Sequence, residues 1–254
     1  MKSRTRHKAT AALLRLGALM VCGLLWELVA RELGEPLLFP TVGAVLRSAW
    51  DDHSLLLNAI GATSATAAVG LGLGGAIALV IGLVGALFPG LLQYLVRQAT
   101  VGYCIPLVTI APVLYVVLSG NGPEVVCAAI GAFFPILLGV AQGLENDPAA
   151  CRSVLASLGC GRLRYTFSVR TWSAVPQLLA AVRIGAAAAV LGATLAEYFG
   201  SPNGLGAAMI NAIDQLDAPE AYALGITATL LVAFTYVLFG EVARLAFPWA
   251  SESR

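Results

Sequence analysis

Two glutamates interrupt apolar stretches of this sequence and are the first candidates for chemistry. Glu27 and Glu197 each lie in an apolar run long enough to cross a membrane. A charge at the centre of a bilayer costs at least about 2.5–3.5 kcal/mol, so each carboxylate should face protein or water. Glu197 is the stronger functional candidate, because Tyr198 and Asn203 follow it closely and could also contact a polar solute. The alternative is a carboxylate that caps local backbone, and for Glu27 we expect a structural role.

The sequence lacks the usual catalytic and metal-binding motifs. The five cysteines show no C-x-x-C spacing and the two histidines lie far apart, so we expect no metal site. The phosphate-binding loop of an ATPase needs a lysine, and the only lysines are Lys2 and Lys8 near the N-terminus. H-E-x-x-H and G-x-S-x-G are also missing, and the apolar stretches contain no Asp. We therefore expect neither a catalytic residue nor a cofactor in this chain.

The composition indicates a polytopic membrane protein. Of the 254 residues, 59% are hydrophobic and 11% are charged, and the mean hydropathy is +0.84. An ordinary soluble domain carries roughly 25% charged residues. The net charge of +1 gives no general basic surface, so we expect no nucleic-acid partner.

Six stretches are long enough to span a bilayer core, which needs roughly 20 apolar residues of helix. They predict an all-α membrane domain over residues 11–247, between a basic tail (1–10) and a short C-terminal tail (248–254). The first stretch could be a signal peptide, but it has no A-x-A site, and we favour a retained helix. The expected spans are residues 11–30, 59–88, 99–119, 124–144, 175–199 and 222–247.

The distribution of Lys and Arg predicts the orientation. With the N-terminus inside, Arg31 and Arg47 lie outside and the other 13 of the 15 basic residues lie inside. This bias follows the positive-inside rule and requires an even number of spans. Both termini are therefore expected in the cytoplasm.

The long inner loop, residues 145–174, contains its own helix signals. Asp147-Pro148 is typical of a helix start, and Gly159 is a plausible C-cap for the run that ends at Leu158. Arg162 and Arg164 follow. The segment is either a solvated loop that obeys the positive-inside rule or a short helix that docks on a cytoplasmic partner.

Prolines and glycines set expectations for the helices. Pro106 and Pro112 predict a kinked third span, beside which Tyr103 and Thr109 could line a polar path. The second span is rich in glycine, and we expect its small residues to serve packing within the chain rather than dimer formation.

Arg97 and Arg183 are expected to anchor their helices at the cytoplasmic membrane interface.

The order of these features resembles the membrane subunits (permeases) of ABC importers of the type I fold. A short helix, Gly159, a basic stretch, Pro176 and then Arg183-Ile184-Gly185 are similar to that family's cytoplasmic signature loop. The resemblance covers most of the chain and is closest to permeases of nitrate, sulfonate, taurine and bicarbonate systems. Other segments resemble the same family, in the same order along the chain. They are Trp26-Glu27 and 38–41 near the first span, 105–107 and 110–112 in the third, 120–124 and 132–136 in the fourth, and 196–199 and 203–206 at the end of the fifth.

The resemblance implies a function and its partners. Such a subunit lies in the bacterial inner membrane, contacts lipid, and forms a translocation path with a second permease, identical or homologous. A separate ABC ATPase holds Mg-ATP, and an extracytoplasmic solute-binding protein delivers the solute. The expected solute is a small anion of the nitrate, sulfonate or taurine kind, or a small polar organic molecule.

The signature loop departs from the family pattern. The family's Glu-Ala-Ala falls on Ser153-Val154-Leu155, and its Leu-Pro falls on Thr171-Trp172. The glutamate that helps to fix this loop in the ATPase groove is therefore missing, which would suit a specialised or asymmetric pairing. The coupling residues implied by the resemblance are Asp147, Ser153, Val154, Leu155, Gly159, Arg162 and Arg164.

Two other classes of protein remain as alternatives. An ATP-independent channel or secondary carrier would need intramembrane charges or inverted repeats, and the sequence offers few charges and no convincing repeat. A membrane enzyme would need a set of catalytic residues that the sequence lacks.

Overall fold

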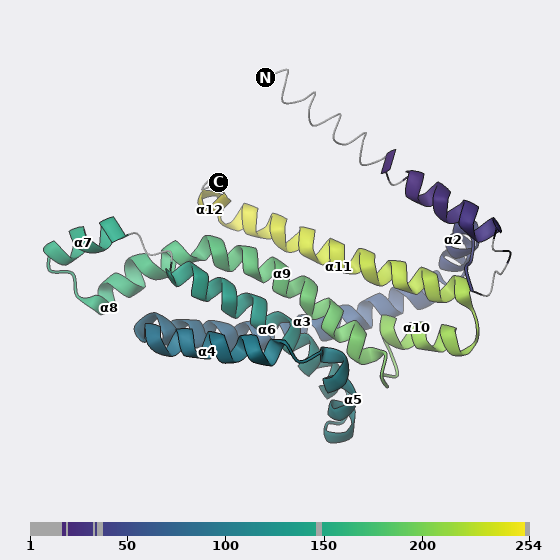
Figure 1. The fold of residues 1–254 in the computed structure, drawn as a ribbon, viewed down its shortest axis with the longest axis horizontal. Helices are drawn as coiled ribbons and strands as arrows, with labels where there is room; N and C mark the ends of the chain where they lie inside the picture. Colours follow the sequence, from purple (N-terminus) through teal and green to yellow (C-terminus); the bar gives the residue numbers. More distant parts are fainter. Residues whose placement is uncertain (1–16, 19, 33, 35–37, 146–148, 252–254) are drawn as a thin grey trace, which may run out of the picture.

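The structure is a computed structural model, and it describes residues 17–18, 20–32, 34, 38–145 and 149–251. All regular structure in these ranges is helical, and Figure 1 shows most of the long helices running roughly along one another. Residues 20–32 form a helical stretch that precedes the labelled elements. Those are α2 (Val42–Asp51), α3 (His53–Leu87), α4 (Pro89–Tyr103), α5 (Leu107–Val117), α6 (Gly122–Glu145), α7 (Ala149–Ser157), α8 (Arg162–Tyr165), the π-helical turn η1 (Thr166–Arg170), α9 (Thr171–Glu197), α10 (Leu205–Asp214), α11 (Ala218–Ala246) and α12 (Pro248–Ser251).

The core of the bundle is the packing of α6 against α9 and α3. These two pairs make the most extensive contacts in the described chain, and α11 packs on the outside of α9. The buried side chains at the centre are mostly alanines, with Ile136, Leu137 and Val190 among them. Because these residues are small, the helix axes can approach closely.

Glycines on α3, α6 and α9 put backbone directly against backbone. A Cβ added to Gly131 of α6 would lie 2.6 Å from the carbonyl oxygen of Ala188 on α9. A Cβ on Gly192 of α9 would likewise lie 2.5 Å from the carbonyl oxygen of Cys127 on α6. Small residues at such crossings are the usual means of packing helices in a membrane, where lipid removes the hydrophobic drive for association.

The expected spans can be compared with the observed helices. Four helices are long and apolar enough to cross a membrane: α3, α6, the continuous run Leu163–Glu197 and α11. The bent pair of α4 and α5 would make a fifth span if it crosses as one unit. The first expected span, residues 11–30, lies partly outside the described residues, and its described part beyond residue 20 is helical. The chain is thus an all-helical, multi-pass membrane protein.

The third expected span is broken rather than merely kinked. α4 begins at Pro89, ten residues before the expected start of this span, and α4 and α5 meet at an angle of 88°. The break falls at Pro106, which has no N–H to donate and adopts an extended ψ of 126°. Pro112, the other predicted cause of a kink, stays inside α5.

Two further helical segments extend the expected pattern. The chain is already helical from Arg162, so α8, η1 and the first residues of α9 occupy the last part of the inner loop expected before a span starting near residue 175. The short helix α10 lies in the connection between α9 and α11 (Figure 1).

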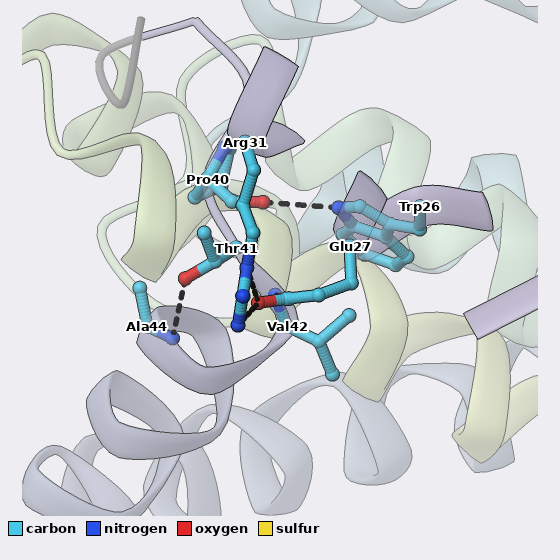
Figure 2. A network of polar contacts seen from close by, with 7 residues as sticks. All are labelled: Trp26, Glu27, Arg31, Pro40, Thr41, Val42 and Ala44. Carbon is cyan, nitrogen blue, oxygen red and sulfur yellow. Dashed lines mark hydrogen bonds and ion pairs between the residues drawn. The ribbon is translucent and has the colours of Figure 1, made fainter. Parts of the chain in front are cut away.

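Contacts of Glu27 hold the first helical stretch against α2 (Figure 2). Its Oε2 accepts a hydrogen bond from the backbone N–H of Val42 at 3.0 Å, and its Oε1 accepts one from Arg31 Nε at 2.9 Å. Trp26 Nε1 donates to the carbonyl of Pro40 at 2.9 Å. The carboxylate thus caps the N-terminus of α2 and pairs with a neighbouring cation. These contacts agree with the structural role expected for Glu27.

Replacing Gly74 by alanine should destabilise the bundle, whereas the same change at Gly72 should not. A Cβ on Gly74 would collide with the Ala129 carbonyl oxygen of α6, but a Cβ on Gly72, two residues earlier on α3, would meet no atom within 4 Å. We expect Gly74→Ala to cost about 1–3 kcal/mol, the usual penalty for overpacking. Thermal unfolding in detergent, followed by size-exclusion chromatography, measures the difference. Equal stability of the two variants would contradict the close approach of α3 and α6.

Candidate functional site

Glu197 forms a buried polar junction between three helices. It ends α9 and is 2% exposed. Its Oε2 accepts hydrogen bonds from Thr63 Oγ1 of α3 at 2.8 Å and from the backbone N–H of Gly206 in α10 at 3.0 Å. Thr63 Oγ1 in turn accepts a hydrogen bond from the backbone N–H of Leu205 at 2.9 Å. The pair of side chains therefore satisfies the first N–H groups of α10, where a carboxylate is electrostatically favoured.

Two glycines allow this junction to form. Gly204 has φ of +111°, a conformation that other residues rarely adopt, and a Cβ there would overlap the Glu197 carboxylate. A Cβ on Gly206 would lie 2.9 Å from Cβ of Glu197. The backbone of the α9–α10 connection thus wraps closely around the carboxylate. Of the two roles weighed for Glu197, capping of local backbone is the one that its contacts display.

A second carboxylate, Glu124, is buried at the same end of the bundle. It lies in the first turn of α6 and is 2% exposed, and neither of its oxygens has a hydrogen-bond partner. The Tyr115 hydroxyl of α5 is buried close to it. Glu197 lies within electrostatic range of both groups. We call Thr63, Tyr115, Glu124 and Glu197 the carboxylate cluster.

The structure disperses the residues that were expected to line a path. Tyr103 is exposed at the end of α4 and stacks on Phe134 at 4.2 Å between ring centroids. Thr109 is exposed on α5, where its hydroxyl donates to the carbonyl of Pro106 at 2.7 Å. Asn203 is exposed in the α9–α10 connection and hydrogen-bonds with Ser201, while Tyr198 is half-buried beside Phe199. Glu197 is the one member of this set within the carboxylate cluster.

Sequence reasoning did not single out Thr63 or Glu124 as site residues. Glu124 is the first residue of the expected span 124–144 and the last of the segment 120–124, so it does not interrupt an apolar run. Its position directly after Gly122-Pro123, where a helix begins, was the available signal. Thr63 sits in a run of small residues on α3, and nothing local marks its partner 134 positions away.

The opposite end of the bundle carries α7, which projects beyond the other helices together with α8 (Figure 1). The predicted C-cap is confirmed: Gly159 has φ of +74°, and the N–H of Cys160 donates to the carbonyl of Leu155 at 2.9 Å. This is the Schellman arrangement that ends a helix at a glycine. Leu155 is half-buried and Ser153 is exposed. Asp147, the expected start of the helix, lies outside the described residues.

The projecting segment exposes large apolar side chains. Val154 is 58% exposed, Leu158 76% and Leu163 63%. Val154 and Leu158 are four residues apart and so share one face of the helical run. Of the two arginines expected to act in coupling, Arg164 is exposed and Arg162 begins α8. An exposed apolar face on a connection between spans is typical of a protein contact surface.

Arg170 links this projecting segment to the core. It ends the π-helical turn that leads into α9. Its Nε donates to the carbonyl of Leu144 at the end of α6 at 3.0 Å, and its Nη1 donates to the carbonyl of Ala86 at the end of α3 at 2.9 Å. A cation is favoured at helix C-termini, and the planar fork of arginine fits two acceptors at once. One side chain thus joins the ends of three helices.

Arg183 lies within α9 and packs on α11. Its guanidinium carbon is 4.1 Å from the ring centre of Tyr236, and Gly240 leaves room for it. Its Nε is buried without a hydrogen-bond partner. The aromatic ring makes a cation–π contact that stabilises the guanidinium charge between α9 and α11.

Comparison with known proteins gives one family and several relatives. The model of the family described as binding-protein-dependent transport system inner membrane component matches residues 74–249. The chain is 25% identical over 232 residues to the formylaminopyrimidine transport permease protein ThiX of Halalkalibacterium halodurans, covering 89% of this chain and 91% of the relative. It is 27% identical to a probable ABC transporter permease protein of Haemophilus influenzae, covering 89% and 94%. It is 29% identical over 158 residues to the riboflavin transport system permease protein RibX of Chloroflexus aurantiacus, covering 62% and 59%.

Replacing Thr63 by valine should loosen the junction around Glu197. The variant keeps the shape of the side chain but removes one donor to Glu197 and leaves the N–H of Leu205 without an acceptor. We expect a loss of about 1–3 kcal/mol for the buried group left unsatisfied, measured by thermal unfolding in detergent. Thr66→Val, one turn further along α3, is the matched control. If both variants unfold like the parent protein, the junction does not stabilise the fold.

Replacing Arg170 by glutamine should free the start of α9 from α3 and α6. The variant keeps one donor but loses the charge and the fork, so we expect a lower unfolding temperature and faster proteolysis between residues 145 and 171. Arg164→Gln, an exposed position on α8, is the control and should change neither. If Arg170→Gln is cleaved between residues 145 and 171 no faster than the parent protein, Arg170 does not hold the start of α9 to α3 and α6.

Proposed function

This chain belongs to the family of binding-protein-dependent transport system inner membrane components, and from that premise we propose how it is powered and what it carries. The chain is the permease subunit of an ABC importer and is not itself catalytic. We propose that α7 docks on a separate ATPase, which holds Mg-ATP, and that this chain binds no cofactor. The single observation that carries the docking proposal is the capped, projecting α7 with its exposed apolar face.

The apolar face of α7 compensates for a missing charge in this proposal. The family's glutamate falls on Ser153, an exposed neutral residue, so an ion pair or charged hydrogen bond from that position is lost. Val154 on α7 and Leu158 directly after it remain as large exposed apolar groups. Burying them in a groove of the ATPase would remove apolar surface from water, which favours association.

Arg170 offers a route from the ATPase to the membrane core. Movement of α7 would be passed through α8 and the π-helical turn to Arg170, and from there to the ends of α3 and α6. π-helical turns within helices often occur at functional sites. We infer that closure of the ATPase on ATP would shift these helix ends and so change which side of the membrane the path faces.

The assembly and its orientation follow from the same proposal. The chain lies in the inner membrane with both termini in the cytoplasm, which places α7 inside and the carboxylate cluster at the outer end. A second permease, identical or homologous, completes the translocation path, and a solute-binding protein outside the membrane delivers the solute. The departure at Ser153-Val154-Leu155 makes a homologous second subunit worth testing.

We propose that the solute is a small polar heterocycle rather than a nitrate- or sulfonate-like anion. The names of two relatives refer to formylaminopyrimidine and riboflavin, both nitrogen heterocycles.

A charge on the apolar face of α7 should prevent recovery of the ATPase. We expect Leu158→Asp to lower the amount of ATPase that co-purifies with the tagged chain by on the order of tenfold or more, because an interface anchor would become an unpaired buried charge. Leu158→Met should retain the ATPase, and Gln215→Asp, beyond α10, controls for added charge. An undiminished yield of ATPase with Leu158→Asp, at equal unfolding temperature, would refute docking through α7.

Deletion of this chain from its own cells should lower uptake of heterocycles selectively. Radiolabelled aminopyrimidine and riboflavin are the test solutes, and taurine and nitrate are the controls, with complementation by the intact gene. We expect loss of uptake for at least one heterocycle and no change for the anions. A loss confined to taurine or nitrate would reverse the proposed solute class.

A further inference from the structure

The short helix α2 carries two apolar stripes, of which only one is covered by the bundle. Val45 is buried, and Ala49, four residues later, packs against the buried cluster around Leu224 of α11. Leu46 and Trp50 are also four residues apart, so they share a face of the helix, but they are 66% and 80% exposed. The second stripe therefore needs a partner that lies outside this chain.

Contacts at both ends place α2 across the bundle rather than along it. Just before its start, Phe39 packs on Tyr222 at the beginning of α11, with 6.1 Å between ring centroids. Near its end, Ala49 packs against the cluster that contains Leu224, again at the beginning of α11, and Leu205 of α10. A helix of 10 residues is about 15 Å long. Because both its ends lie beside the same part of α11, α2 must run across that helix.

This position is the boundary of the membrane. α11 is long and apolar enough to cross a bilayer, and α2 contacts it where it begins. In Figure 1, α2 lies at the end of the bundle that also carries α10. Along the chain α2 stands between residues 20–32 and α3, and both expose large apolar side chains, among them Leu25, Leu28 and Leu57. On membrane helices, acyl chains are the ordinary neighbours of such side chains.

The residues beside the exposed stripe suit the zone between acyl chains and headgroups. Trp50 has an apolar ring and a polar N–H, which is why tryptophan is enriched at membrane interfaces. Its ring lies 6.5 Å from that of His53, between centroids. Arg47 and Asp51 are exposed, and each follows Leu46 or Trp50 by one residue, about 100° further round the helix. An apolar face flanked by a charged one is the pattern of a helix that lies in the interface.

We propose that α2 is an interfacial anchor that inserts Leu46 and Trp50 into the lipid bilayer at the end of the bundle that carries the carboxylate cluster. Acyl chains cover the apolar stripe, and lipid phosphates lie beside Arg47. Glu27 joins the first helical stretch to the start of α2, so the anchor holds that stretch and the beginning of α11 at a fixed depth. This inference depends neither on the proposed solute nor on docking of the ATPase.

Fluorescence quenching of the full chain in phosphatidylcholine vesicles tests the anchor. The chain has four tryptophans, so the contribution of Trp50 is the difference between the parent protein and Trp50→Phe, a variant that keeps an aromatic ring. Bromine placed near the headgroup end of the acyl chains should quench this contribution more strongly than bromine at the chain ends. Iodide dissolved in the water should quench it least.

Two results of this experiment would overturn the proposal. If iodide quenches the Trp50 contribution and brominated lipid does not, the face is open to water and free for a soluble protein such as the solute-binding protein. If neither quencher reaches Trp50, the stripe is covered by protein, such as a second permease.

An aspartate in the stripe gives a second test with a matched control. Leu46→Asp places a charge where acyl chains should lie, so it should reduce the quenching of Trp50 by bromine near the headgroups and increase the quenching by iodide. Ser54→Asp, at an exposed polar position in the first turn of α3, should leave both values at the parent level. Unchanged quenching in Leu46→Asp would show that this face is not inserted in lipid.

Discussion

The close approach of the α6 backbone to those of α9 and α3 is the constraint on which the rest of this molecule depends. At Gly131 and Gly192 the neighbouring backbone occupies the space that a side chain would need. Helices in a membrane gain little from the hydrophobic effect, so close packing must supply much of the association energy. Because α6 and α9 run in opposite directions, this packing brings the start of α6 beside the end of α9. Glu124 and Glu197 meet for that reason.

Polar side chains fasten the same three-helix core at each end. At one end Glu197 and Thr63 hold α3, α9 and the first turn of α10 together. At the other end Arg170 holds the termini of α3 and α6 to the beginning of α9. The buried cluster at the middle of the core consists of small and apolar side chains. A mechanical signal arriving at Arg170 would therefore act on a compact unit, and its effect would be felt at the carboxylate end.

Sequence patterns with a local physical cause were predictable. The all-helical membrane fold and the importer family are confirmed, and so are the cap at Gly159 and the disruption of the helix at Pro106. What escaped prediction depended on distant contacts. The break between α4 and α5 reaches 88° where the prolines predicted only a kink, the chain is helical through Arg162–Arg170, and Glu124 was hidden because it stands at a helix start. The nitrate and sulfonate subfamily suggested by short motifs is not confirmed, because such motifs report the fold of a permease more than its solute.

Uptake into proteoliposomes tests most directly whether this chain is a passage driven by another protein. The chain would be reconstituted alone and, in parallel, with the ATPase and binding protein that co-purify with it, and the vesicles would be loaded with ATP or left without it. The account predicts accumulation of solute only when the ATPase and ATP are both present. Movement of solute through the chain alone, with no ATPase in the vesicles, would contradict it and identify an autonomous channel or carrier.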